Sequence, residues 1–592
     1  MWRSESSFPL GSSHSAEGDE NTRRTEDAMK QRLSERDDQT MSRRTFLGGS
    51  LAFAGTMGMA ALGGCQPVGA RAQRDAAELG GTNGSGASEG GSPLSFFEPP
   101  RGTVAFEADQ VPENSIAKTE EVDLVVCGAG LAGVVLSLAA SERGLKTVLL
   151  EKTAGMNVRG SGIGSLSCSV VKEAGIVFDE RAYLDDALKA ALYRCDAEIW
   201  RTWVERNGEA VDWLIEATKD AITPYLNLPD SGAAVDTFGG VNTYNDTIEA
   251  KEGMVAWAQA ALDKAIENGT SVRYSTPAVQ LVREQDRGVT GVVAKSMEDG
   301  SYLRLTASKG VALCTGGYEN NLEMLRENMR PEDLNVVAWR LPNTENTGDG
   351  QLMGEAIGGV LEPRPHIMMR DPGGSAAAHS SMTFLSCRWP RVNKLGKRFV
   401  NECISHNDLA NAFMRQPGGR DWIILAGPTL KEAMEGTTYK DHTPGARKQT
   451  AEQIIEQAKD VIVQADTLEE LAQATGIDPE NLQETCRRIT ELHANGEDVD
   501  FGTDPGMLMS FESGPYYAAE EGASNLVTVS GLVVTSDSEV VDGDGRAIPG
   551  LYALGNCSGG MFNDSYPHEL SAISHSRCVV FSYLLARHLA EA

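Results

Sequence analysis

The sequence predicts an α/β fold, and two neighbouring features carry this prediction. An apolar strand over 122–127 ends in the glycine turn Gly128-Ala-Gly130-Leu-Ala-Gly133, and an apolar helical run follows from Leu131 to about Arg143. A second apolar strand over 147–150 ends at Glu151. Strand, glycine turn, helix and strand in this order form half of a Rossmann-like dinucleotide-binding fold.

The residues of the glycine turn have separate expected roles. Gly128 allows the tight turn, Gly130 lets a pyrophosphate approach the backbone, and Gly133 lets the helix pack against the sheet. The N-terminus of the helix is then available to hold phosphates. Glu151 is placed to bind ribose hydroxyls, and an acid at this point disfavours a ribose phosphate. FAD and NAD share this signature, so the motif does not choose between them.

Residues 1–65 have the form of an export signal. Ser42-Arg-Arg-Thr-Phe-Leu47 precedes an uncharged run rich in Gly and Ala that ends at Gly64, as in twin-arginine signals. A transmembrane anchor is the alternative, but the glycines make a poor membrane helix. Leu62-Gly-Gly-Cys65 resembles a lipoprotein processing site, where Cys65 would be acylated; a simple cleaved signal is the other possibility. We expect a protein of the cell envelope, and either Met29 or Met41 is a candidate start.

Residues 66–119 predict a flexible linker, because the stretch around 80–92 consists almost wholly of Gly, Ser, Thr, Asn, Ala and Glu. Folding is expected to begin near Glu120, and the remaining chain is long enough for two domains. The formal net charge of −31 argues against nucleic acid or an anionic membrane surface as a partner. The oligomeric state is not indicated.

The ten cysteines form no C-x-x-C pair and no C-x-x-C-H haem site, so metal clusters and c-type haem are not expected. No metal ligand is predicted. Cys127, Cys314 and Cys578 lie in apolar runs and are expected to be buried thiols without disulfide partners.

Three later segments repeat the pattern of strand, glycine and helix. The apolar run 310–314 leads into Thr315-Gly316-Gly317, and Asn346-Thr-Gly-Asp349-Gly opens a plausible helix. The strand 548–554 again ends in glycine, at Gly555-Asn556. Together these segments indicate a chain that returns repeatedly to one extended cofactor.

With these motifs the chain resembles the flavoprotein family of fumarate reductase, succinate dehydrogenase and ketosteroid dehydrogenase, from roughly Glu120 to the C-terminus. It is similar to the branch of ketosteroid dehydrogenases and exported enone reductases of the cardiac-glycoside-reductase type. The motifs that carry the resemblance are the glycine turn, Arg159-Gly-Ser-Gly162, Cys314-Thr-Gly-Gly-Tyr318, Asn346-Thr-Gly-Asp-Gly350, Val392-Asn-Lys-Leu-Gly-Lys-Arg-Phe-Val-Asn-Glu402 and Gly550-Leu-Tyr-Ala-Leu-Gly-Asn-Cys-Ser-Gly-Gly560.

The resemblance implies an FAD-binding domain with an inserted α+β cap domain. The FAD domain would comprise 120–364 and 525–592, and the cap 365–524. The FAD is expected to be non-covalent, because the usual histidine tether is missing from 155–162. The residues implied to bind it are Gly128, Ala129, Gly130, Gly133, Glu151, Lys152, Gly160, Ser161, Gly162, Val279, Thr315, Gly316, Asp349, Gly555, Asn556, Ser571 and Ala572.

The chain departs from the family where fumarate reductases bind a dianion. His406 stands in place of the family's arginine that acts as general acid, and Tyr566 stands in place of a second arginine. Without these arginines a dicarboxylate would be desolvated with little compensation. Tyr566-Pro567 instead resembles the ketosteroid branch, whose tyrosine binds a substrate carbonyl. The expected substrate is a small, largely neutral conjugated carbonyl compound.

The expected reaction reduces a C=C bond with hydride from reduced FAD, while Tyr566 polarises the carbonyl. His406 is the leading proton donor, and His568 and Glu569 are alternatives. A structural hydrogen bond is the competing interpretation for each of these three side chains. Because no haem or cluster motif is present, electrons are expected from a membrane-bound cytochrome or another quinol-linked donor, as in anaerobic respiration.

Three other interpretations remain open. The reverse reaction, a 3-ketosteroid dehydrogenation, would need a basic tyrosine, for which Tyr183, Tyr193, Tyr225 and Tyr244 are candidates. A reductase of fumarate or another unsaturated acid is the second. A non-catalytic flavoprotein that relays electrons is the third, and the long cap segment argues against it.

Overall fold

The computed structural model describes residues 101–591, apart from 229–231, 239–240, 285–286, 335, 337, 340–344, 373–388, 429–449, 451, 454–455, 457–458, 460, 564 and 568–569. The chain divides into two units, 1–92 and 93–592, and the description below concerns the second. The expected export signal, the lipoprotein site at Cys65 and most of the expected linker lie outside the described residues.

A parallel sheet forms the centre of the nucleotide-binding domain. Its central strand pairs in parallel with a strand on each side, and each of these pairs in parallel with a further strand. The order across the sheet is β18 (Glu539–Val541), β19 (Ala547–Ala553), β11 (Tyr302–Leu313), β1 (Ile116–Cys127), β2 (Thr147–Leu150) and β8 (Ser271–Arg273). The antiparallel pair β9 (Ala278–Glu284) and β10 (Gly288–Lys295) extends from β11.

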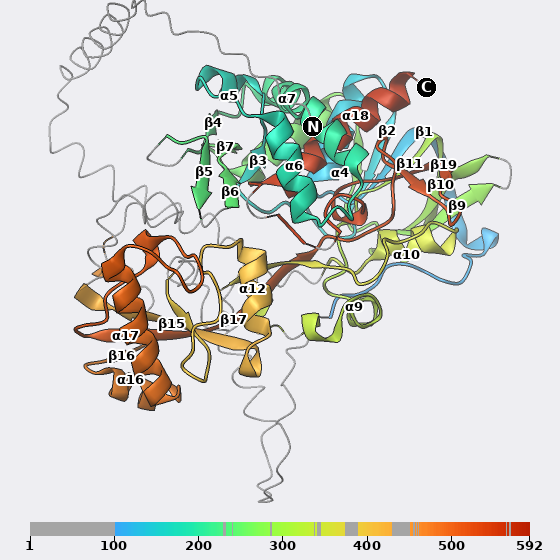
Figure 1. Cartoon of the computed structure of the whole chain (residues 1–592). Coiled ribbons are helices and arrows are strands. Elements are labelled where there is room, and N and C mark those ends of the chain that lie inside the picture. The colour runs from blue at the N-terminus through green and yellow to red at the C-terminus, as the bar shows by residue number, and fades with distance from the viewer. Residues whose placement is uncertain are drawn as a thin grey trace, which may run out of the picture. The chain divides into compact units, whose positions relative to one another are not determined.

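Long helices cover this sheet, and α4 is buried along nearly its whole length because its sequence is apolar on every face. The first, α4 (Leu131–Glu142), packs against both α8 (Met254–Glu267) and α18 (Ile573–Glu591). Helix α18 also packs on α7 (Ala197–Thr218) (Figure 1). Smaller elements surround this core: β3 (Gly162–Gly164), α5 (Ser169–Glu173), α6 (Glu180–Ala190), β4 (Pro224–Leu226), β5 (Val235–Phe238), β6 (Val241–Tyr244), β7 (Thr247–Ala250), α9 (Leu322–Asn328) and α10 (Asp349–Ala356).

The cap has a sheet and a hydrophobic core of its own. The long strand β17 (Tyr516–Thr528) is its centre, and the cap core includes Trp389, Ile424, Leu482 and Ile489. The other elements are β12 (Ala338–Trp339), β13 (Met368–Pro372), β14 (Arg391–Val392), α12 (His406–Met414), β15 (Arg420–Ala426), β16 (Ile462–Ala465), α16 (Leu468–Thr475) and α17 (Pro479–Asn495). Short 3-10 helices occur at η1 (Glu113–Ser115), η2 (Pro331–Leu334), η4 (Pro417–Gly419), η6 (Pro505–Met507) and η7 (Gly555–Cys557).

Side-chain hydrogen bonds cap the N-termini of two helices of the cap domain, α16 and α17. Thr467 and Glu470 form a reciprocal capping box at α16, and the side chain of Asp478 accepts a hydrogen bond from the Asn481 N–H at α17. The two sheets with their separate cores make the observed architecture an α/β nucleotide-binding domain with an inserted α+β cap, as the sequence predicted.

The boundaries differ from the expected ones at two places. The fold begins before Glu120, since β1 starts at Ile116 and the N–H of Ala105 donates to Asp349 at 2.8 Å. The linker expected over 66–119 therefore ends earlier, because its last residues pack on the nucleotide-binding domain. At the other boundary, β17 runs without interruption through the expected division at 524/525.

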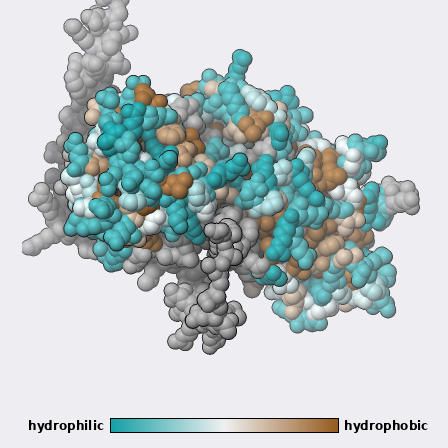
Figure 2. All heavy atoms as spheres, turned by 60° about the horizontal axis from the view of Figure 1, so that its bottom comes forward, coloured by the Kyte–Doolittle hydropathy of each residue, from teal (hydrophilic) through white to brown (hydrophobic). Residues whose placement is uncertain are grey.

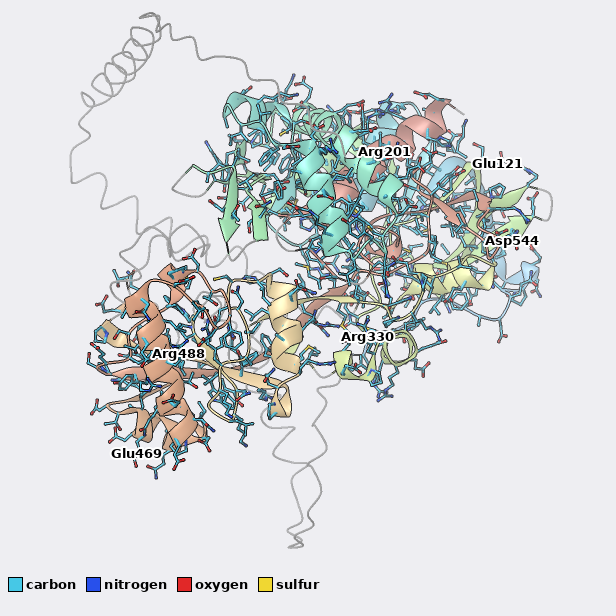
Figure 3. The ribbon with its side chains drawn as sticks, in the orientation of Figure 1. Glu121, Arg201, Arg330, Glu469, Arg488 and Asp544 are labelled. Atoms are coloured by element: carbon cyan, nitrogen blue, oxygen red, sulfur yellow. The ribbon has the colours of Figure 1, made fainter. Side chains whose placement is uncertain are left out.

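The surface is polar, with charged side chains such as Arg201 and Arg488 directed outward (Figure 3). On the face drawn in Figure 2, apolar residues form separate small groups between hydrophilic ones. Within the described ranges, no helix combines the length and the apolar character needed to cross a bilayer. The eight cysteines among the described residues are free thiols, which confirms the expectation for Cys127, Cys314 and Cys578.

Candidate functional site

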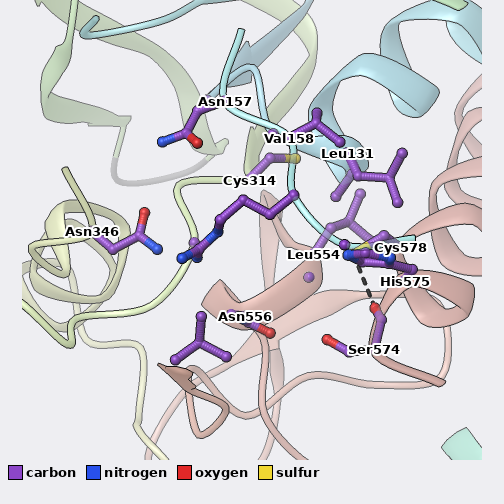
Figure 4. Close-up of a pocket in the computed structure, with 18 of the residues that line it drawn as sticks. Leu131, Asn157, Val158, Cys314, Asn346, Leu554, Asn556, Ser574, His575 and Cys578 are labelled. Carbon is purple, nitrogen blue, oxygen red and sulfur yellow. Dashed lines mark hydrogen bonds between the residues drawn. The ribbon is translucent and has the colours of Figure 1, made fainter. Parts of the chain in front are cut away.

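A cavity of about 650 Å³ lies where the parallel strands end in glycine-rich segments. Cys127 ends β1 and Gly128 follows it, Glu151 follows β2, Thr315 follows β11, and Gly555 follows β19. Figure 4 shows Leu131 of α4 and Asn157, Cys314, Leu554 and Asn556 converging on it. The carboxyl ends of parallel strands are where α/β sheets bind ligands, so the topology itself places a ligand site here.

The glycine turn has the geometry that the sequence predicted. A Cβ atom on Gly133 would lie 1.9 Å from the Gly128 carbonyl oxygen, so only glycine lets α4 approach the turn this closely. Gly130 caps α4 without any side-chain hydrogen bond, and a Cβ there would meet nothing nearer than 3.8 Å. The first N–H groups of α4 thus face open cavity and need acceptors.

Glu151 is held by the glycine turn. Its Oε2 accepts a hydrogen bond from the Ala129 N–H at 2.8 Å, and its Oε1 accepts from the N–H and hydroxyl of Thr153, each at 2.8 Å. This fixes the carboxylate at the cavity wall. Lys152, the next residue, lies 2.9 Å from Asp349 and donates to Thr347 at 2.8 Å.

Fourteen of the seventeen expected cofactor residues line the cavity: Gly128, Gly130, Glu151, Lys152, Gly160, Ser161, Gly162, Thr315, Gly316, Asp349, Gly555, Asn556, Ser571 and Ala572. Ala129 and Gly133 support the turn from behind, as described above. Val279 does not line the cavity; it is buried against Val111 and Val293, while its neighbours Pro277 and Ala278 form the wall. Alternation along β9 explains this difference, because adjacent side chains point to opposite faces of a strand.

Tyr566 is far from Glu151 in the sequence but lines the same cavity, and its side chain is 4% exposed. The N–H of Ser574 donates to its hydroxyl oxygen at 3.3 Å, and its ring packs edge-on against Phe562 with centroids 4.9 Å apart. The cap sheet reaches the same cavity through Met369 of β13 and Val527 of β17. The tyrosine expected to act on substrate is therefore part of the cavity wall.

The expected proton donors have a different status. His406 is the first residue of α12 and is not among the described residues of the cavity wall. The next residue, Asn407, nevertheless lies near that wall in space. Its side-chain amide donates to the hydroxyl of Ser565 at 3.2 Å, and Ser565 directly precedes Tyr566. His568 and Glu569 lie outside the described residues.

The four tyrosines considered for the dehydrogenase reaction do not line the described part of the cavity. Tyr183 and Tyr244 are buried, and Tyr244 donates to Asp186 at 2.8 Å. Tyr193 is 64% exposed. Tyr225 comes closest, because it donates to Glu249, whose side chain lines the cavity. The same carboxylate raises the pKa of Tyr225 to about 12.

Two cavity residues were not predicted as functional. The Arg159 guanidinium lies 3.6 Å from buried Glu319, which also accepts a hydrogen bond from Asn346 at 2.6 Å. The His575 imidazole lies against Gly160, and its Nδ1 is 3.0 Å from the Gly162 carbonyl oxygen. Burial lowers the pKa of His575, so the ring is neutral and Nδ1 carries the proton that Gly162 accepts. His575 and Gly162 are 413 residues apart in the sequence, so no local sequence pattern indicates their contact.

Comparison with known proteins decides the identity of the ligand. Residues 123–571 match the FAD binding domain family, which is well over half of the chain. The chain belongs to this family. FAD is accordingly its cofactor, and the choice between FAD and NAD that the glycine turn left open is settled.

The chain is similar to FAD-dependent reductases of C=C bonds. It is 27% identical to a vinyl phenol reductase of Lactiplantibacillus plantarum over 80% of this chain and 96% of that protein. It is 29% identical to a urocanate reductase of Eggerthella lenta over 76% and 72%. The protein is an oxidoreductase of a family whose members act on C=C and CH–CH bonds.

The fold is that of ketosteroid dehydrogenases as well. The structure of a 3-ketosteroid Δ4-(5α)-dehydrogenase from Rhodococcus jostii aligns with a TM-score of 0.62 over 84% of this chain and 100% of that one, at 20% identity. The cavity suits FAD: the open cradle at Gly130 and the helix N-terminus suit the pyrophosphate, and the Glu151 carboxylate suits the ribose hydroxyls. Bound FAD supplies hydride transfer to or from a carbon atom.

Proposed function

We propose that the protein is an exported FAD-dependent reductase of a C=C bond conjugated to a carbonyl group, acting on a neutral enone such as a steroid-like compound in anaerobic respiration. The observation that carries this proposal is the place of Tyr566 in the cavity wall. A phenol hydroxyl that donates to the substrate carbonyl stabilises the negative charge that develops on its oxygen as the alkene is reduced.

The charges of the cavity support a neutral substrate. Both cationic side chains among its described lining residues, Lys152 and Arg159, are already paired with carboxylates, at 2.9 and 3.6 Å. The carboxylates of Glu249 and Glu345 add negative charge to the same wall. A dianion such as fumarate would lose its hydration and find no unpaired cation among these residues.

The chain's own residues divide the remaining work. Tyr566 orients the carbonyl, with its oxygen fixed by the Ser574 N–H. The apolar side chains of Met369, Leu526 and Val527 limit water at the wall formed by the cap sheet. We propose that His406 donates the proton that the α-carbon receives. Its side chain would reach the cavity by movement of the N-terminus of α12.

The comparisons support the reaction class and leave the substrate open. One relative is named for a vinyl phenol, which is uncharged at neutral pH, and another for urocanate, which is an anion. The twin-arginine pattern before Leu47 supports export and thus a membrane-bound cytochrome or another quinol-linked electron donor, because NADH is a cytoplasmic compound.

The test is an anaerobic reoxidation experiment on the FAD-loaded protein. The flavin is reduced with dithionite, and fumarate, urocanate, 4-vinylphenol and a steroid enone are added separately while flavin absorbance is followed. We expect rapid reoxidation by the enone and slow reoxidation by fumarate. Y566F should lower the enone rate about 10²- to 10³-fold with FAD still bound, since it removes one hydrogen-bond donor to the developing oxyanion.

Two outcomes would contradict the proposal. Reoxidation by fumarate at the enone rate would mean that an unrecognised cation binds dicarboxylates. Reduction of the oxidised flavin by a saturated ketosteroid, faster than reoxidation by the enone, would assign the dehydrogenase direction instead.

A further inference from the structure

Arg577 is a buried cation directly behind the FAD cavity. It lies in α18, is 3% exposed, and precedes Cys578, which lines the cavity. A guanidinium keeps its proton at neutral pH even where burial lowers its pKa, as it does here. The domain therefore holds a full positive charge beside its cofactor.

The guanidinium of Arg577 donates a hydrogen bond to a neutral group. Its Nη2 donates to the Asn556 Oδ1 at 2.7 Å, while Nε and Nη1 find no hydrogen-bond partner among the described residues. The guanidinium also stacks 4.5 Å above the Phe562 ring. Buried Glu362 attracts Arg577, but its carboxylate accepts from the N–H groups of Gly531 and Gly560 at 3.1 and 2.7 Å.

The bond to Arg577 determines which way the Asn556 amide points. Arginine can only donate, so the amide oxygen must face Arg577. The amide NH₂ is then turned away from it, and Asn556 lines the cavity (Figure 4). The backbone of Asn556 is held separately, since its carbonyl accepts from Gln351 at 3.3 Å. An NH₂ group turned away from Arg577 is therefore free to serve a ligand in the cavity that Asn556 lines.

We propose that Arg577 is a positioning residue for FAD that fixes Asn556 as a hydrogen-bond donor to the cofactor and raises the flavin reduction potential through its buried charge. Reduction adds negative charge to a flavin, and a nearby cation in a poorly hydrated interior stabilises that charge. This inference rests on the FAD site and not on the choice of substrate, so it holds or fails independently of the enone assignment.

The experiment is a reductive titration of the FAD-loaded protein against a reference dye, which reports the midpoint potential without any substrate. We expect R577M to shift the flavin at least tenfold toward its oxidised form at a fixed potential, or about 30 mV for two electrons. R577K, which keeps the charge, should recover most of this shift. R587M is the matched control, since Arg587 lies on the same helix but pairs with Glu209 at the surface.

N556D separates this proposal from a simple loss of packing. Its carboxylate still accepts from Arg577, but it neutralises the cation and has no N–H to offer FAD. We expect a lower potential and weaker FAD binding, measured by equilibrium dialysis. If R577M does not fold, N556D decides alone. Potentials of R577M or N556D equal to that of R587M would overturn the proposal.

Discussion

The cap and the nucleotide-binding domain bury charge in opposite ways. In the cap, Arg391 donates to Asp421 and Glu521, and all three side chains are fully buried. Arg398 likewise lies 2.7 Å from Glu402 and 2.6 Å from Asp498. In the nucleotide-binding domain, Arg577 hydrogen-bonds a neutral amide beside a cavity.

Buried carboxyl groups show the same contrast. Both side-chain oxygens of fully buried Asp246 lack a hydrogen-bond partner among the described residues, and burial raises its pKa well above the usual range. Its neighbours in the chain, Asn245 and Thr247, line the cavity. Arg577 and Asp246 thus both lie beside the cavity with incomplete hydrogen bonding, as is common for polar groups near a ligand site.

The largest expected effect is on the cap. R391M should destabilise the protein by about 3–5 kcal/mol, because it leaves Asp421 and Glu521 buried without their cation. Urea unfolding followed by circular dichroism measures this. R487M, which removes an exposed arginine, should leave the urea midpoint close to that of the unchanged protein. A loss below about 1 kcal/mol for R391M would show that the buried carboxylates are neutral without it.

The next largest effect compares the cost of replacing one glycine in each domain by alanine. Gly160 lines the cavity at φ 83°, and a Cβ there would lie 2.0 Å from the His575 Cε1 atom. G160A should therefore cost more than the roughly 1–2 kcal/mol of the backbone conformation and should release FAD. Gly476 of the cap has φ 72° and open space around it, so G476A should cost only the backbone term with FAD retained. Equal losses in the two variants, measured by thermal unfolding and flavin absorbance, would contradict this contrast.

The smallest effect concerns pH. The folded state lowers the pKa of His575, so the unfolded chain takes up a proton as the pH falls through about 6.5 while the folded chain does not. Stability is therefore lost as the pH falls below that value, by at most about 1.4 kcal/mol per pH unit for one proton. H575N, whose amide can still donate to Gly162, should show a flatter decline between pH 7.5 and 5.5. Parallel curves for the two proteins would mean that His575 does not titrate in this range.

Local chemistry made much of the fold predictable. The glycine turn, helix α4 from Leu131 and the acid after β2 all follow from short-range rules of strand, turn and helix. The capping box of α16 and the N-cap residue of α17 follow in the same way. Tyr566 was predicted from a motif, and the cavity confirms its position in the wall, while its role in catalysis stays a prediction.

The unpredicted parts depend on contacts across the chain. Arg159 follows a recognised motif position, but its partner Glu319 is 160 residues away, so the neutralised charge could not be read from the sequence. His575 and Arg577 stand in an apolar helix whose pattern suggests only burial. Val279 is buried beside the cavity wall, because a resemblance fixes a strand but not which of two adjacent side chains faces the cavity.

The two strands that connect the cap are paired with each other. Met368–Pro372 of β13 pairs antiparallel with β17 from Thr528 to Ala523, with one register shift between Met369 and Arg370. Each strand contributes to the cavity wall, through Met369 and Val527. The same strand β17 pairs with β15 and β16 inside the cap, so one continuous strand joins the cap sheet to the wall of the flavin pocket. Any displacement of the cap that moves β17 would therefore reach the pocket at Val527.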